Sequence, residues 1–245
     1  MSACLFEELD ALVGLLSTRG AGPSGEWTVH CAGLLGLDGV SVSAATPDGG
    51  DELLWYSDPL AARLADLQFT LGEGPGVEAA RDGSLHLIAD VRNLPHSRWA
   101  GFAPGSVELG VRSVFALPLR LGAIRIGALI GHGCEARALT EEGLEAALAL
   151  CDALTHHLLS TASQDGAGAR AQEEPHGTLH RAVVHQASGM LSVDLGVDLA
   201  TALGRLRAHA FARDRPVVAV ARDVVARRLR LTDDRGRRDI GREPP

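Results

Sequence analysis

Several residue types are missing or scarce in this sequence, and each shortage excludes a class of protein. Lysine is absent from all 245 residues, so no phosphate-binding P-loop, whose motif ends in lysine, can be present. The four cysteines lie far apart without a C-x-x-C pair, which excludes a disulfide scaffold and argues against structural zinc. No apolar run reaches the roughly 18 residues that span a membrane, and the acidic first residues do not resemble a signal peptide. We therefore expect a soluble, cytoplasmic protein.

The chain does contain enough apolar sequence for a folded core. Hydrophobic residues make up 46% of it and its mean hydropathy is +0.08, which excludes wholesale disorder. Residues 160–177 interrupt this pattern because they are small, polar and rich in glycine, as is typical of linkers. We expect a first domain over 1–160, a flexible linker over 161–177, a second domain over 178–231 and a disordered tail over 232–245.

Charge is divided unevenly along the chain. Residues 1–175 hold 10 arginines against 23 acidic residues, whereas residues 176–245 hold 13 arginines against 8 acidic residues. An acidic body followed by a basic region suggests a sensing part joined to a part that meets a polyanion. An arginine-rich, solvated surface from a GC-biased genome is the alternative, and charge alone leaves both open. The basic region has one aromatic residue, Phe211, which excludes an aromatic platform for stacking bases.

Hydrophobic periodicity in the first domain mixes helices with strands. Strands that pair as hairpins and are flanked by helices predict an α+β fold, with an antiparallel sheet sandwiched by helices, rather than a Rossmann sheet. The expected helices cover residues 5–16, 25–35, 59–67 and 140–159, and the expected strands cover 39–44, 52–56, 85–89, 112–121 and 124–130.

The second domain has an entirely helical pattern. Thr178 and Asp198 are residues that cap helices, Gly196 can end the first helix, and Pro216 fits the first position of a third. Three such short helices bury little surface on their own. We therefore expect a small all-α, three-helix domain whose helices pack on one another and on a second copy of the chain.

No motif in the chain carries recognisable catalytic chemistry. The glycine-rich string Leu71-Gly-Glu-Gly-Pro-Gly-Val77 lacks the dinucleotide-binding spacing and predicts a tight turn that enters a helix at Val77. His156 and His157 point to different helix faces, and the pair at 176 and 180 straddles a glycine, so neither forms a metal site. No G-x-S-x-G nucleophile motif occurs. We expect no enzyme activity, no metal and no cofactor.

The helical region resembles an ANTAR domain. The resemblance rests on His180-Arg-Ala-Val-Val-His-Gln-Ala-Ser-Gly-Met-Leu191, on Asp198-Leu-Ala-Thr-Ala-Leu-Gly-Arg-Leu-Arg-Ala-His-Ala210 and on Val217-Val-Ala-Val-Ala-Arg-Asp-Val-Val225. Residues 1–160 are similar to the GAF domains that precede ANTAR in actinobacterial regulators, through strings such as Leu71-Gly-Glu-Gly-Pro-Gly76 and Glu108-Leu-Gly-Val-Arg-Ser-Val-Phe-Ala-Leu-Pro-Leu119.

This resemblance implies both an architecture and a function. It implies a six-stranded type of GAF sandwich that senses a small molecule, and a three-helix unit that binds paired hairpins in nascent RNA. Stabilising those hairpins prevents the overlapping terminator stem from forming, and members of the family typically act as homodimers. The cyclic-nucleotide type of GAF domain uses an Asn-Lys motif, which a chain without lysine lacks. The ligand of the sensor therefore stays open.

The resemblance also suggests where RNA and ligand bind. Arginine would contact phosphates and base edges from the exposed helix sides, and Gln186 would either read a loop base or act as a packing amide. The expected RNA-binding residues are Arg181, His185, Gln186, Ser188, Arg205, Arg207, Arg222 and Arg227; the expected pocket residues are Trp99, Arg112 and Phe115, whose alternative role is core or lid packing.

Two other functions fit the same residues. The second or third C-terminal helix could be the recognition helix of a DNA-binding regulator. The helices could instead only dimerise or dock a protein partner, so that the chain is a sensor without affinity for nucleic acid.

Overall fold

The computed structural model describes residues 25–45, 51–165, 178–213 and 215–231. The chain divides into two compact units, Met1–Arg181 and Ala182–Pro245. The helix expected at 5–16, the tail at 232–245 and most of the expected linker lie outside the described residues.

The first unit is built on a five-stranded antiparallel sheet. Its strands are β1 (Gly39–Ala45), β2 (Asp51–Tyr56), β3 (His86–Ile88), β4 (Ser113–Leu121) and β5 (Ile124–Gly133), in the order β2-β1-β5-β4-β3. The strands expected at 112–121 and 124–130, which the apolar runs on each side of Gly122-Ala123 predict to be a hairpin, pair as β4 and β5. The resemblance to GAF domains implied six strands, whereas the described residues form five.

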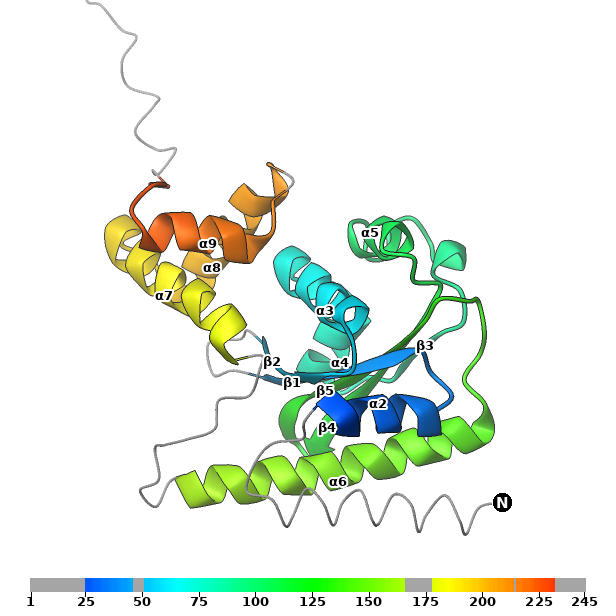
Figure 1. Cartoon of the computed structure of the whole chain (residues 1–245). Helices are drawn as coiled ribbons and strands as arrows, with labels where there is room; N and C mark the ends of the chain where they lie inside the picture. Colours follow the sequence, from blue (N-terminus) through cyan, green and yellow to red (C-terminus); the bar gives the residue numbers. More distant parts are fainter. Residues whose placement is uncertain (1–24, 46–50, 166–177, 214, 232–245) are drawn as a thin grey trace, which may run out of the picture. The chain divides into compact units, whose positions relative to one another are not determined.

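Helices cover both faces of this sheet (Figure 1), which confirms the predicted sandwich. On one face lie α2 (Gly25–Leu34) and α6 (Glu141–Asp165); on the other lie α3 (Pro59–Leu71), α4 (Pro75–Asp82) and α5 (Phe102–Glu108). Strand β4 serves both cores because side chains alternate across a strand. Phe115 and Leu117 pack toward α2 and α6, and Val114 and Ala116 pack toward α3, α4 and α5.

The glycine-rich string forms the turn between α3 and α4. Gly72 ends α3 with a φ of 68°, and Gly74 precedes α4 with a φ of 130°, both in the region that favours glycine. The buried amide of Gln68 secures the turn, since its Oε1 accepts a 2.7 Å hydrogen bond from the Gly76 N–H. The predicted tight turn is therefore confirmed, and the helix starts at Pro75, two positions before Val77.

Two helices of the first unit are longer than their sequence patterns predicted. Helix α3 continues to Leu71 instead of residue 67, because the first suitable left-handed stop is Gly72. Helix α6 runs to Asp165 and so occupies the first five residues of the expected linker.

The three C-terminal helices follow the predicted pattern: α7 (Thr178–Leu195), α8 (Leu199–Phe211) and α9 (Val217–Val225). Asp198 caps α8 by accepting a 2.8 Å hydrogen bond from the Thr201 N–H. Pro216 is the N-cap residue of α9 rather than its first residue. The core positions of α8 and α9 are Ala202, Leu203, Leu206, Ala210, Val217, Val218, Val220, Ala221 and Val224. Among the described residues, no helix is long and apolar enough to cross a membrane.

Candidate functional site

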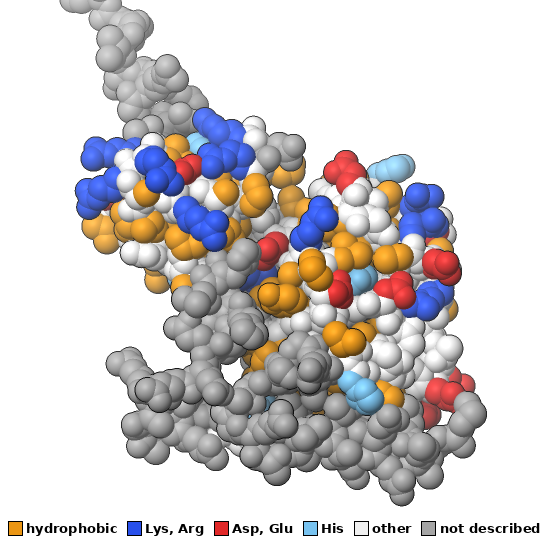
Figure 2. All heavy atoms as spheres, in the orientation of Figure 1, with side chains coloured by type: hydrophobic (Ala, Val, Ile, Leu, Met, Phe, Trp, Pro, Cys, Tyr) orange, Lys and Arg blue, Asp and Glu red, His pale blue; other side chains and the backbone are white. Residues whose placement is uncertain are grey.

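The second unit presents a surface rich in arginine. Because the chain has no lysine, every blue side chain in Figure 2 is an arginine, and many gather over α8 and α9. The apolar stripes of these helices face inward, which leaves the long charged side chains at the outside. We call this the basic helical surface; its members are Arg205, Arg207, Arg213, Arg215, Arg222, Arg227, Arg228 and Arg230.

Asp223 organises part of the basic helical surface. Its carboxylate accepts a 2.7 Å hydrogen bond from Arg215 and a 3.0 Å hydrogen bond from the Arg228 Nε–H. These bonds, from Arg215 and then Arg228, hold the pKa of Asp223 below its usual value. Arg215 precedes α9 and Arg228 follows it, so one carboxylate ties the two ends of the helix together. The sequence pattern did not predict this role, because the two partners of Asp223 lie outside the helix that carries it.

Most of the expected RNA-binding residues are accessible on the second unit. Gln186, Arg222 and Arg227 are exposed, and Arg205 and Arg207 are half-buried. His185 is also half-buried. These positions therefore offer polar and basic groups at the surface of all three helices.

Ser188 differs from the expectation that it lies on an exposed helix side. Its side chain is only 3% exposed, because it lies beside Ala187 on the face of α7 that also buries Val184 and Leu191. The sequence pattern did not fix the rotation of this helix closely enough to separate Ser188 from its exposed neighbour Gln186.

Arg181 also departs from the expected exposed position. It is the last residue of the first unit, and its side chain is 0% exposed. Its guanidinium lies 2.8 Å from Asp51 Oδ2 and 3.3 Å from Asp66 Oδ1, and it stacks 4.2 Å from the centre of the Phe69 ring. A buried cation needs such partners to offset its lost hydration. Arg181 is therefore not part of the basic helical surface.

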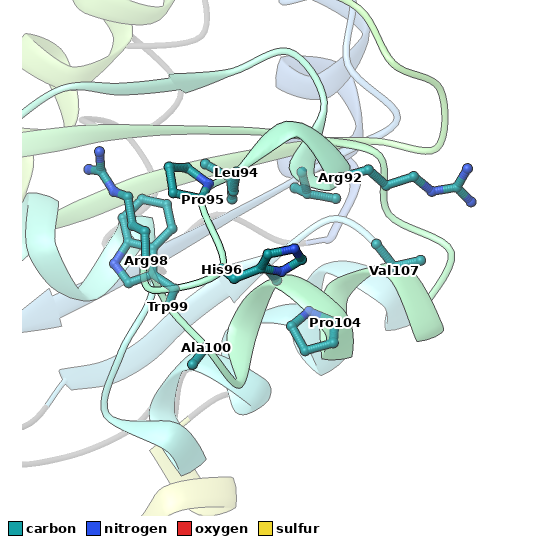
Figure 3. Close-up of a pocket in the computed structure, with 11 residues that line it drawn as sticks. Arg92, Leu94, Pro95, His96, Arg98, Trp99, Ala100, Pro104 and Val107 are labelled. Atoms are coloured by element: carbon teal, nitrogen blue, oxygen red, sulfur yellow. The ribbon is translucent and has the colours of Figure 1, made fainter.

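The first unit contains a pocket within one stretch of chain, residues 91–107. Its volume is about 270 Å³, and it lies between the 3-10 helix η1 (Val91–Asn93), the loop that follows and α5 (Figure 3). Leu94, Trp99 and Val107 provide apolar walls, and the basic side chains at the pocket are Arg92, His96 and Arg98.

Trp99, one of the three expected pocket residues, does line this pocket. Its backbone has a φ of 50°, a left-handed conformation that is uncommon for a residue with a side chain. Three contacts hold it there: the indole N–H donates a 2.7 Å hydrogen bond to Glu78 Oε1, and the rings of His86 and Phe102 pack edge-on at 5.4 Å and 6.0 Å. The Arg98 guanidinium stacks on the indole at 4.4 Å from its centre.

Arg112 and Phe115 do not line the pocket with Trp99. Arg112 instead forms a two-pronged ion pair with Asp90, at 2.7 Å and 3.2 Å. Its hydrogen bonds lower the pKa of Asp90, whose carboxylate also caps η1 through the Arg92 N–H. Phe115 is directed to the opposite face of the sheet by the alternation along β4 and packs in the core beneath α2 and α6. The structure therefore does not bring these three residues together in this pocket.

Comparisons with known proteins show a domain family for the C-terminal region and a fold for the first unit. The model of the ANTAR domain family matches residues 178–225. The GAF domain of a phosphoenolpyruvate-protein phosphotransferase from Coxiella burnetii is similar over 68% of this chain and 98% of its own, at 18% identity and a TM-score of 0.51. The corresponding GAF domain from Acinetobacter covers 70% of this chain and 100% of its own, at 14% identity and a TM-score of 0.51. No curated protein matches the chain. The chain therefore has the GAF–ANTAR architecture, with a unit of GAF fold followed by an ANTAR domain.

Proposed function

We propose that this chain is a signal-responsive transcription regulator that acts on nascent RNA. Its ANTAR domain binds tandem hairpins and prevents the overlapping terminator stem from forming, and its GAF unit senses a small molecule. The observation that carries this proposal is the ANTAR match at 178–225, the same residues that bear much of the basic helical surface. Binding to nascent RNA places the protein in the cytoplasm.

The arginines of the basic helical surface suit a folded RNA. A guanidinium group can bind a phosphate through two parallel hydrogen bonds or stack on an unpaired base. Arg222 and Arg227 are exposed on or just after α9, and Gln186 is exposed on α7, where its amide can read the edge of a loop base. We assign phosphate contacts to the arginines and base discrimination to Gln186, with His185 beside it.

We further propose that the active form is a homodimer. The second unit leaves Val193 83% exposed and Phe211 65% exposed, although both are large apolar side chains. Such side chains on a small helical unit favour burial against a second copy of the chain.

A binding titration tests this function with three probes of equal length at a low and a high salt concentration. The first is a tandem-hairpin RNA, the second is the same RNA with scrambled loops, and the third is a duplex DNA. We expect tight binding to the first RNA and a clear loss of affinity when the loops are scrambled.

Two other results of this titration would each replace the proposal. Sequence-selective binding to the duplex that survives RNA competitor indicates a DNA-binding regulator. Equal binding to all three probes that vanishes at high salt indicates a generic polyanion surface. In that case the helices serve to dimerise or to dock a protein partner.

A further inference from the structure

We propose that the pocket of residues 91–107 binds a small organic anion with an apolar body, a monocarboxylate on a short aliphatic or aromatic chain. This inference rests on the sensor role given to the first unit and names the chemical class of its signal. Three properties of the pocket lead to it: the charge of its lining, the chemistry of its walls and its size.

The charge of the lining is entirely basic. Arg92, His96 and Arg98 line the pocket, and none of its lining residues is acidic. Within the described part of the chain, the side chains of Arg92 and His96 form no hydrogen bond and no ion pair, although the charge of Arg92 acts on the nearby Asp90. Figure 3 shows Arg98 on one side of the pocket, Arg92 on the other and His96 between them, with the guanidinium groups of both arginines directed outward. All three residues are exposed, so both long arginine side chains can turn toward a carboxylate bound beside His96 and donate charge-assisted hydrogen bonds to it.

The acidic residues nearest to this lining are already engaged elsewhere. One carboxylate oxygen of Glu78 accepts a 2.7 Å hydrogen bond from the Trp99 indole N–H. The other oxygen lies 3.5 Å from the Arg98 guanidinium, at the limit of a hydrogen bond. Asp90 is held by Arg112 and by the Arg92 N–H. The Arg98 guanidinium makes two polar contacts, the one of 3.5 Å with Glu78 and one of 3.2 Å with His86 Nδ1. It therefore has N–H donors left for a ligand.

The walls of the pocket select the rest of the ligand. Trp99 is only 5% exposed and its indole N–H is used by Glu78, so it offers carbon atoms rather than a hydrogen bond. Leu94 and Val107 continue the apolar surface. A polar body such as a sugar would lose its hydration there without new partners. An aliphatic or aromatic body would gain from leaving water.

The size of the pocket limits the ligand. A volume of about 270 Å³ lies just below the range of roughly 300–1,000 Å³ that is usual for ligand pockets. A nucleotide or a tetrapyrrole exceeds this space, whereas a carboxylate with a chain of a few carbons fits it.

Calorimetric titration of the full chain with matched ligands tests the proposal. The probes are hexanoate and phenylacetate, compared with hexanamide and hexylamine, which keep the hexanoate tail and replace the negative charge. We expect at least one carboxylate to bind with at least tenfold higher affinity than the amide, and the amine not to bind.

Variants then locate the site. Arg92→Gln and Arg98→Gln should each weaken carboxylate binding about tenfold or more, the usual effect of losing a charged hydrogen-bond donor. Arg125→Gln is the matched control, because Arg125 is an exposed arginine on β5 outside the lining and its replacement should change nothing. In the wild type, the indole N–H resonance of Trp99, assigned with Trp99→Phe, should shift on binding.

Two results would overturn the inference. One is that neither carboxylate binds better than hexanamide, and the other is that Arg92→Gln and Arg98→Gln behave like the Arg125→Gln control. Neither result bears on RNA binding, which is measured separately with the hairpin probes. Failure of the ligand class and failure of the proposed regulator are therefore distinguishable.

Discussion

The two units of this chain differ in how many of their arginines are bound to the fold. In the first unit, three arginines are held by carboxylates: Arg112 pairs with Asp90, Arg137 pairs with Asp38 at 3.1 Å, and Arg181 is buried between two carboxylates. Arg92 and Arg125 of the same unit are exposed. In the second unit, one carboxylate, Asp223, binds two arginines, and exposed arginines surround it.

This difference separates arginines that support a fold from arginines that can bind a partner. In a paired guanidinium, N–H donors are bound to a carboxylate of the protein, which also balances the positive charge. Among the described residues, Arg222 and Arg227 form no ion pair, so their charge is available to a polyanion. The excess of arginine in the sequence becomes informative only when each side chain is assigned to one of these groups.

The largest expected effect is on RNA binding by the second unit. The double variant Arg222→Gln with Arg227→Gln should weaken binding to tandem-hairpin RNA by tenfold or more at low salt. The plot of log affinity against log salt concentration should also become less steep, by the amount that corresponds to the loss of about two phosphate contacts. Filter binding over a series of salt concentrations measures both quantities.

The matched control removes two arginines that are paired in the first unit. Arg112→Gln with Arg137→Gln has the same change in net charge and should leave RNA affinity unchanged. If both double variants lose affinity equally, net charge rather than the basic helical surface controls binding, and the distinction between the units fails.

A smaller effect is expected from Asp223→Asn. The pKa of Asp223 is lower in the folded chain than the ordinary aspartate pKa of 3.8. Its ion pairs therefore stabilise the second unit fully at pH values above 3.8, and this stabilisation is lost as the pH falls through the pKa of the folded state. At neutral pH the variant should therefore melt at a lower temperature than the wild type, and this difference should shrink in acid. Thermal melts followed by circular dichroism at several pH values measure it; a constant difference at every pH would argue against the role of the carboxylate charge.

The smallest effect is expected at His86 of the first unit. Its pKa is lowered mainly by burial, while Glu78 acts in the opposite direction and Arg98 adds to the lowering. As the pH falls, His86 is protonated in the unfolded chain at a higher pH than in the folded chain. The folded state therefore loses stability as the pH falls below about 6.5. His86→Gln should reduce the loss of stability between about pH 7.5 and about pH 5.5.

Urea denaturation at the two pH values measures this effect, with the exposed His156→Gln as control. Asp82 and Ser84 also face the His86 ring, because the Ser84 hydroxyl lies 2.7 Å from its Nε2 and bonds to Asp82. If His86→Gln and His156→Gln have the same pH profile as the wild type, the contribution of His86 is negligible.

Local patterns in the sequence predicted the elements that local forces determine. The hairpin of β4 and β5 follows from two apolar runs with Gly122-Ala123 between them. Helix α8 follows from the Asp198 cap and its apolar stripe. In both cases the signal lies within the element itself, and the structure agrees.

The lining of the pocket and the burial of individual arginines depend on contacts between residues that are distant in the sequence. Trp99, in the loop before α5, adopts its left-handed conformation where Glu78 of α4 accepts the hydrogen bond of its indole N–H. Arg181 is buried because two carboxylates far along the chain converge on it. Phe115 was grouped with Trp99 because the sequence did not show which face of the sheet each strand residue would meet.

Transcription in vitro with purified bacterial RNA polymerase, on a template whose leader encodes tandem hairpins and an overlapping terminator, tests the central claim most directly. We expect the wild-type chain to raise the fraction of transcripts that read through the terminator. The Arg222→Gln, Arg227→Gln variant should not raise it, and the Arg112→Gln, Arg137→Gln control should act like the wild type. Unchanged termination at wild-type concentrations that saturate the hairpin RNA would contradict the claim that the exposed arginines of this domain serve antitermination.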